Sequence, residues 1–294
     1  MKRRGKHIIS STVEHDAIRK SLDELEKRGF EVTRLKPDAS GAIPVQSVVD
    51  ALRDDTILVS LMMVNNETGA VTDISAVSRE LKRAGSQALL HTDAVQGFMK
   101  VQFRAKTLGA DMISISGHKI HAPKGIGALY IRAGLKLKPF IVGGSQESGM
   151  RAGTEAMPQI AAFGAAGEIA YAGMKENIAR MSALRERAVS RLERDIPELR
   201  VISSADSAPH ILSISLPGWR SEVLMNFLEA RGVYVSRSSA CKKGGRSHVL
   251  EAVGLDAKTI DGAIRIGLSR FTTEEDIDAL CDAMRDAHDT LAHR

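Results

Sequence analysis

Short apolar runs alternate with amphipathic helical patterns through the first two thirds of this 294-residue sequence, and this alternation strongly constrains the fold. One helical pattern places Ala17, Ile18, Leu22 and Leu25 on one face and ends at Gly29. Strand and helix in alternation are typical of an α/β protein with a mostly parallel sheet flanked by helices on both faces. The runs predicted as strands are 7–11, 31–35, 56–64, 88–92, 112–116 and 126–131.

A long helical pattern over 158–196 leads out of this region. We therefore expect a large domain at 1–175 and a smaller C-terminal α+β domain at 176–294, with strands near 210–216 and 264–268. Helices are predicted after Ser221 and after Thr272. Thr272 and Glu275 have the spacing of a capping box ahead of the last helix.

Composition narrows the class of protein. The net charge is +5, but the Lys and Arg residues are spread along the helices and aromatic residues make up only 4% of the chain, which argues against direct nucleic-acid binding. We find no apolar run of roughly 18 residues and no stretch of signal-peptide length at the start, so we expect no membrane contact and a cytoplasmic location.

The two cysteines differ in their surroundings. Cys281 shares an apolar helical stripe with Ile277, Leu280 and Met284, where a cysteine is usually a small buried hydrophobe. Cys241 lies in the polar stretch 235–245, where two following lysines favour the thiolate and two glycines loosen the backbone. Cys241 is therefore the candidate nucleophile, the alternative being an incidental surface cysteine.

A lysine directly follows one of the predicted strands. The run 112–116 leads into Ser116, Gly117, His118 and Lys119, and ligands of open α/β sheets bind at the carboxyl ends of strands. A lysine held partly out of water there has a lowered pKa and can bind a carbonyl cofactor covalently. Ser116 and His118 could contact a phosphate. The simpler alternative is a solvated loop lysine.

Two neighbouring strand ends also carry polar side chains. Asp93 and Gln96 follow one strand, and Asn66 follows another. A carboxylate such as Asp93 can keep a pyridine nitrogen protonated, so that the ring acts as an electron sink. Taken singly, Asp93 could be a helix cap and Asn66 a turn residue. Arg265 could clamp a carboxylate, or be an ordinary surface arginine.

A metal site is the rival hypothesis, because His91, Asp93, His118 and His121 are all good ligands. Their spacing matches no compact zinc pattern, so we expect no metal.

Eight motifs in order, VEH, NNETG, HTDAVQ, SGHK, PKGIGALY, GMRAGTE, SSAC and IRIGLSRFTTEED, resemble those of the cysteine desulfurases. These are fold-type I pyridoxal 5'-phosphate enzymes of the class V aminotransferase group. The resemblance implies removal of sulfur from L-cysteine, giving L-alanine and a persulfide for iron–sulfur cluster or other thio-cofactor assembly.

For the cofactor, the resemblance implies that Lys119 bonds to it covalently and Asp93 partners the pyridine nitrogen. Gln96 would contact the ring hydroxyl, and His15 would stack on the ring and help to move protons. Asn66 would lie near the ring hydroxyl and the substrate carboxylate.

The remaining roles follow from the same resemblance. Ser116 and His118 would hold the phosphate, and Thr154 would reach the phosphate of a neighbouring subunit, which implies a homodimer. Arg265 would bind the substrate carboxylate. Cys241 would take the sulfur and pass it to an acceptor or scaffold protein.

One departure leaves alternatives open. Members of this family usually have a further N-terminal section with a phosphate-binding helix start, which this sequence does not contain. The alternatives are therefore a truncated, inactive member unable to hold the cofactor, or a selenocysteine lyase or aminotransferase on the same scaffold.

Overall fold

The computed structural model describes residues 5–237 and 245–291. Its first sheet has six strands in the order β2-β1-β3-β4-β5-β6, and all neighbours run parallel except the last pair, β5 and β6. The expected mostly parallel sheet is therefore confirmed. Its strands are β1 (His7–Ser11), β2 (Glu31–Leu35), β3 (Thr56–Met62), β4 (Leu89–Asp93), β5 (Met112–Ser116) and β6 (Gly127–Ile131).

Apolar residues of these strands face helices on both sides, as expected for buried parallel strands. In β1, Ile8 packs with Leu22 of α1, whereas its neighbour Ile9 belongs to the core that contains Ile74 and Val77 of α3. Successive side chains of a strand point to opposite faces, so α1 and α3 cover opposite sides of the sheet. The helices here are α1 (Asp16–Lys27), α2 (Val45–Asp50), α3 (Ile74–Arg83) and α4 (Ala105–Leu108).

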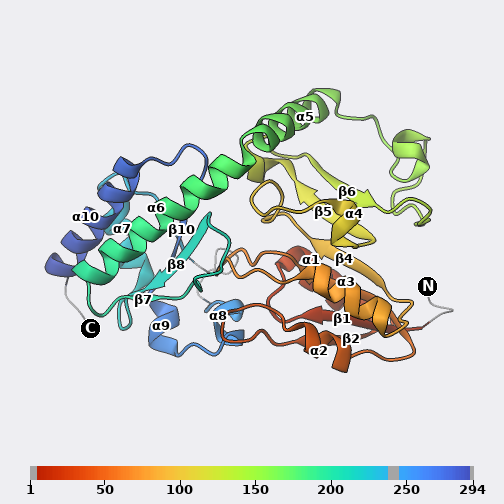
Figure 1. The fold of residues 1–294 in the computed structure, drawn as a ribbon, viewed down its shortest axis with the longest axis horizontal. Helices are drawn as coiled ribbons and strands as arrows, with labels where there is room; N and C mark the ends of the chain where they lie inside the picture. Colours follow the sequence, from red (N-terminus) through yellow and green to blue (C-terminus); the bar gives the residue numbers. More distant parts are fainter. Residues whose placement is uncertain (1–4, 238–244, 292–294) are drawn as a thin grey trace.

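A second sheet of four strands lies at the other end of the molecule in the order β7-β8-β10-β9, and its neighbours are antiparallel (Figure 1). The helices α6, α7 and α10 pack together beside it. Its strands are β7 (Arg200–Val201), β8 (Ile211–Ser215), β9 (Ser236–Arg237) and β10 (Ala263–Gly267), and its helices are α7 (Ser221–Glu229), α8 (His248–Ala252), α9 (Ala257–Asp261) and α10 (Glu274–Thr290).

The helices α5 (Met157–Ala172) and α6 (Met174–Asp195) meet at Gly173 and run from the first sheet to the second (Figure 1). The second half is also hydrogen-bonded to the first. The Ser203 hydroxyl donates to the Thr68 carbonyl, and the Ala208 amide donates to the Gly69 carbonyl. The division into domains at 1–175 and 176–294 stays a prediction.

The predicted cap of the last helix, α10, was wrong by one residue. The capping box of α10 is formed by Thr273 and Asp276, not by Thr272 and Glu275. The Thr272 hydroxyl instead accepts a hydrogen bond from the Ser269 amide in the preceding turn, which leaves the next threonine at the cap.

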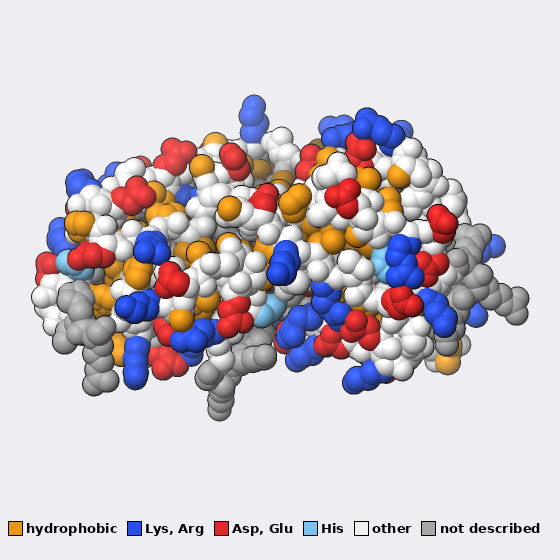
Figure 2. Space-filling view, turned by 90° about the horizontal axis from the view of Figure 1, so that it is seen from below, with side chains coloured by type: hydrophobic (Ala, Val, Ile, Leu, Met, Phe, Trp, Pro, Cys, Tyr) orange, Lys and Arg blue, Asp and Glu red, His pale blue; other side chains and the backbone are white. Residues whose placement is uncertain are grey.

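Basic and acidic side chains are interleaved on the face seen in Figure 2, without a continuous basic stripe. Among the described residues, no helix has the length and apolar character needed to span a bilayer.

Candidate active site

A cavity of about 370 Å³ opens where the carboxyl ends of β1, β3, β4 and β5 meet residues of the second half of the chain. Parallel strands end at the same edge of a sheet, so residues far apart in sequence gather there. Eight of the ten predicted site residues line it: His15, Asn66, Asp93, Gln96, Ser116, His118, Lys119 and Arg265.

Lys119 lies on the short 3-10 turn η1 (Gly117–Ile120) that follows β5. Its amine is partly buried and forms no ion pair with any described residue. Burial lowers the pKa of this amine, and the positive charge of Arg265 lowers it further. A lysine in this state is more readily the free base that attacks a carbonyl carbon.

Asp93 ends β4, the strand next to β5 in the sheet. The side chain is 9% exposed, and its Oδ1 accepts a hydrogen bond of 2.9 Å from the Val95 amide, which fixes the carboxylate at the edge of the cavity. Gln96, one turn further on, bonds through Oε1 to Nε2 of His210 at 3.3 Å.

Ser116 and His118 form a pair, with Ser116 Oγ 2.6 Å from His118 Nδ1. Burial lowers the pKa of His118, and the charges of Lys119, Lys100 and Lys124 add to this effect. Lys100 is itself partly buried, and this desolvation lowers its pKa to about 8. The positive charges around Ser116 and His118 suit a phosphate group.

Arg265, on β10, connects the two halves of the molecule at this cavity. Its Nη1 donates a 2.7 Å hydrogen bond to the carbonyl oxygen of Asn66, 199 residues away. His15 lies opposite as the N-cap of α1, where its Nδ1 accepts a hydrogen bond from the Ala17 amide. Its side chain is exposed, so the ring is accessible to a ligand.

Glu14 is a cavity residue that the sequence analysis missed. It is fully buried, and its Oε1 accepts hydrogen bonds from the Ser11 hydroxyl and the Met62 amide, while its Oε2 has no partner among the described residues. Burial raises its pKa to about 8, and the charge of Asp93 adds to the rise. Glu14 is therefore a neutral carboxylic acid near pH 7.

Glu67 is the second missed acid. It is 6% exposed, and its Oε2 accepts a hydrogen bond from the hydroxyl of Ser247, 180 residues further along the chain. Burial raises its pKa to about 7, against the opposing effects of Ser247 and Arg265. Both acids lie inside the motifs VEH and NNETG, directly after apolar strands, and that position was the available signal.

The metal alternative receives no support. Both ring nitrogens of His91 are engaged, Nδ1 with Ser60 Oγ at 2.8 Å and Nε2 with Ser114 Oγ at 2.9 Å, so His91 is a core histidine. In residues 5–237 and 245–291, no group of three or more His, Cys, Asp or Glu side chains could hold a metal ion.

Three further positions from the sequence analysis remain. Thr154 is exposed on the segment before α5 and does not line the cavity. Cys241 lies outside the described residues, whose nearest members are Arg237 and Gly245. Cys281 is 1% exposed, and burial raises its pKa to about 11, as its apolar stripe predicted.

The aminotransferase class-V family matches residues 2–280. This extent, together with the fold and the lysine-bearing cavity, shows that the chain belongs to that family. Within the family it is a homologue of the cysteine desulfurases, which are pyridoxal-phosphate enzymes.

A cysteine desulfurase 2 of Trichormus variabilis is 43% identical over 282 residues, which cover 95% of this chain and 70% of the relative. A cysteine desulfurase IscS of Clostridium botulinum is 38% identical over 288 residues, covering 96% and 72%. A solved NifS-like protein superposes with a TM-score of 0.92 at 35% identity, covering 99% and 77% of the two chains. The structure of SspA in complex with cysteine has a TM-score of 0.76 at 32% identity, covering 92% and 75%.

Proposed function

We propose that this protein binds pyridoxal 5'-phosphate in the cavity and transfers the sulfur of L-cysteine to Cys241. The observation that supports this most strongly is that Lys119, on the turn after β5, and Asp93, at the end of the adjacent strand β4, line the same cavity. Relatives of 38–43% identity that carry the name cysteine desulfurase support the choice of substrate.

The cavity residues suit this cofactor. Lys119 offers an amine with a lowered pKa for the aldehyde, and Asp93 offers a carboxylate for the pyridine nitrogen. Ser116 and His118 would hold the phosphate, and Gln96 would contact the ring hydroxyl. When bound, the cofactor supplies an electron sink for bond cleavage near the substrate α-carbon.

The same cavity provides groups for the substrate. Arg265 would bind the carboxylate of L-cysteine, with Asn66 beside it. Lys119, once its amine is free, would move a proton at the substrate α-carbon, because its lowered pKa makes it an effective base at neutral pH. His15 would stack on the ring and help to move protons.

Cys241 would attack the sulfur of L-cysteine as a thiolate. A bond forms between the sulfur of Cys241 and the sulfur of L-cysteine while the C–S bond of L-cysteine breaks. The electron pair of the broken bond stays on the carbon, and protonation of that carbon gives L-alanine. Cys241 retains a persulfide, and no external oxidant is required. Lys242 and Lys243, which follow in sequence, favour the attacking thiolate.

A sulfur acceptor or scaffold protein would then take the persulfide sulfur.

A homodimer is proposed because exposed apolar side chains gather on β6, on the segment 140–142 and on α5, in sequence on both sides of Thr154. Large exposed apolar patches mark interaction sites. The exposed apolar side chains of these three segments are Leu129, Tyr130, Phe140, Ile141, Val142, Met157, Ile160, Ile169 and Tyr171.

Borohydride reduction tests the cofactor assignment. After incubation with pyridoxal phosphate, reduction should fix the cofactor onto the Lys119 peptide, and Lys119→Ala should abolish the adduct. Lys100→Ala is the matched control, because Lys100 is a second partly buried lysine with a lowered pKa, and its charge acts on His118 beside Lys119. An adduct that survives in Lys119→Ala, or that maps to Lys100, rejects the assignment.

Persulfide labelling tests the sulfur acceptor. After incubation with L-cysteine, the label should mark the Cys241 peptide, and Cys241→Ser should still form the reducible adduct while releasing no sulfide. Cys281→Ser should behave like the parent protein because Cys281 is buried with a raised pKa. Label on Cys281 would show that the chemistry belongs to the other thiol.

A further inference from the structure

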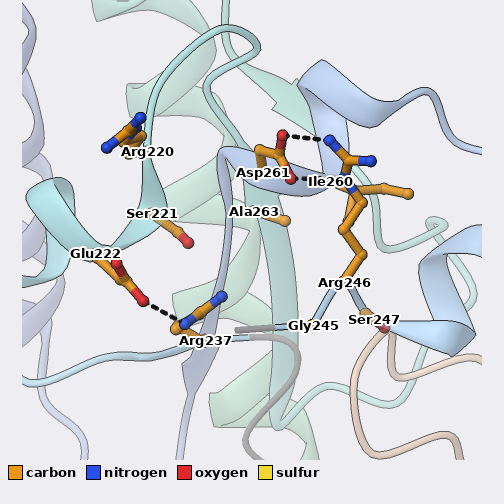
Figure 3. A pocket seen from close by; sticks show the side chains of 10 residues that line it. All are labelled: Arg220, Ser221, Glu222, Arg237, Gly245, Arg246, Ser247, Ile260, Asp261 and Ala263. Atoms are coloured by element: carbon orange, nitrogen blue, oxygen red, sulfur yellow. Dashed lines mark hydrogen bonds and ion pairs between the residues drawn. The ribbon is translucent and has the colours of Figure 1, made fainter. Parts of the chain in front are cut away.

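A second pocket, of about 260 Å³, lies in the C-terminal half at the start of α7. Neither the eight predicted residues of the first cavity nor Thr154 lines it. Figure 3 shows Arg220, Arg237 and Arg246 around the space, together with two acidic residues. The described residues that line it are Arg220, Ser221, Glu222, Arg237, Gly245, Arg246, Ser247, Ile260, Asp261 and Ala263.

The first turn of α7 faces this pocket with unused donors. The helix has nine residues, and its N-cap residue, Arg220, provides no side-chain cap. The amides of Ser221 and Glu222 have no carbonyl partner within the helix, because the first amides of any helix lack one. Partial positive charge therefore collects at this end of α7.

Ser221 is the second, independent observation. Its side chain is only 5% exposed, and its hydroxyl has no hydrogen-bond partner among the described residues. The hydroxyl points into the pocket (Figure 3). The oxygen atom itself is not among the fully buried, unpartnered polar atoms of the described residues, so it stays open to the pocket, where it could bond to a ligand oxygen.

The charges of the lining favour an anion. Asp261 binds Arg246 in a two-pronged ion pair at 2.8 and 2.9 Å, and Glu222 pairs with Arg237. Arg220 has no ion-pair or hydrogen-bond partner for its guanidinium in the described part of the chain. The hydrogen bond from Arg246 lowers the pKa of Asp261, and the charges of Arg220 and Arg237 lower it further, so three guanidinium groups act at this place.

We propose that this pocket is a binding site for a single oxyanion group, a carboxylate or a phosphate, held by Arg220, the Ser221 hydroxyl and the first amides of α7. Arg246 and Ser247 line both this pocket and the cavity described above, so a bound group would lie directly behind one wall of that cavity. The source of the group is either a free ion or an acidic side chain of a partner polypeptide.

Trp219 provides a built-in probe for the test. It is the only tryptophan of the sequence, it is 8% exposed, and it precedes Arg220 directly. Sodium phosphate and, separately, a blocked tetrapeptide with two glutamates would be titrated at constant ionic strength into the full chain without L-cysteine. Emission of Trp219 and heat of binding would be recorded in parallel, so that a silent tryptophan does not decide the result.

Saturable binding of phosphate that Arg220→Gln weakens would assign a free oxyanion to this pocket, and binding of the peptide alone would assign a partner's carboxylate. Arg220→Gln should weaken binding about tenfold or more, Ser221→Ala by a smaller factor, and Arg220→Lys should restore part of the loss because it keeps the charge. Arg180→Gln, on an exposed arginine of α6 outside the pocket, should change nothing.

Absence of saturable binding for both probes, in emission and in heat, would overturn the proposal. Equal affinities in the parent protein and in Arg220→Gln would also overturn it. Because no step of the test uses the cofactor or L-cysteine, failure of the desulfurase proposal would leave its result unaffected.

Discussion

The cavity at the edge of the first sheet and the pocket at the start of α7 both contain carboxyl groups, but they control them in opposite ways. In the cavity, Glu14 and Glu67 are buried and form no ion pair with a guanidinium of the described residues, and burial raises their pKa values to about 8 and about 7. In the pocket, Asp261 is more exposed and paired with Arg246, which lowers its pKa. Burial therefore decides the charge of an acid in the cavity, and a neighbouring arginine decides it in the pocket.

Substitution of Asp93, a cavity residue, should have the largest effect, and this effect should fall on turnover. Asp93→Asn removes the carboxylate that would keep the pyridine nitrogen protonated, while the phosphate contacts remain. We expect turnover with L-cysteine to fall about a thousandfold, with a much smaller loss of cofactor affinity. Steady-state kinetics and a cofactor titration measure the two quantities. Equal losses would instead identify Asp93 as a structural residue.

Glu14 tests the effect of burial. Its pKa in the folded protein, about 8, lies above its ordinary value of 4.5, so between these pH values the folded state holds a proton that the unfolded state has lost. This contribution to the free energy of unfolding is therefore full below about pH 4.5 and falls as pH rises toward 8, by up to about 1.4 kcal/mol per pH unit.

Glu14→Gln keeps the shape of the neutral acid but cannot titrate. Urea unfolding at pH 5, 6, 7 and 8 should show the variant gaining stability relative to the parent protein as pH rises. The difference between the two curves isolates Glu14 from the other titrating groups. Parallel curves across this range would show that Glu14 does not retain its proton.

Ser247 tests the link between the two halves of the chain. Its hydroxyl donates to Glu67 and accepts from the Leu250 amide as the N-cap of α8. Ser247→Ala should lower the free energy of unfolding by about 1–2 kcal/mol and raise the pKa of Glu67, because a hydrogen bond that favours the carboxylate is lost.

Thr273→Ala is the control for that variant, because it removes the cap of α10 and leaves Glu67 untouched. It should cost a similar free energy of unfolding without changing its pH dependence between pH 5 and 7. The same pH dependence in both variants would mean that Ser247 acts only as a helix cap.

Asp261 should show the smallest effect. Its pKa in the folded protein lies below the ordinary value of 3.8, so the stabilisation is present above that pH and is lost as pH falls below it. Because the pair with Arg246 is half-exposed, Asp261→Asn should cost less than about 1 kcal/mol at pH 7. A larger loss in thermal unfolding at low and high salt would contradict the contrast between the two regions.

Local pattern was sufficient for much of the fold and for most of the proposed cavity lining. The strands 7–11, 31–35 and 112–116 have the predicted bounds, because apolar runs between polar turns leave little choice of register. Lys119, Asp93 and Asn66 meet in one cavity because parallel strands share an edge.

The features that could not be predicted from the sequence depend mainly on contacts between segments that are distant in the chain. The raised pKa of Glu67 depends on burial beside Ser247, 180 residues away, and no spacing rule reports such a pairing. Glu14 looks like a helix-start acid until its complete burial is known. The shift of the α10 cap by one residue had a smaller cause, since two successive threonines compete for one position.

The core of the first sheet is completed by residues from the second half of the chain. Ala208, Ile211 and Val249 pack into it, although its last strand ends at Ile131. During synthesis, the ribosome therefore releases all six strands well before the residues that finish their packing. At roughly 5–20 residues per second, the interval between Ile131 and Val249 is on the order of ten seconds. For that time an incomplete apolar surface is accessible to chaperones, and late synthesis, not the formation of the strands, sets when this half of the protein reaches its final stability.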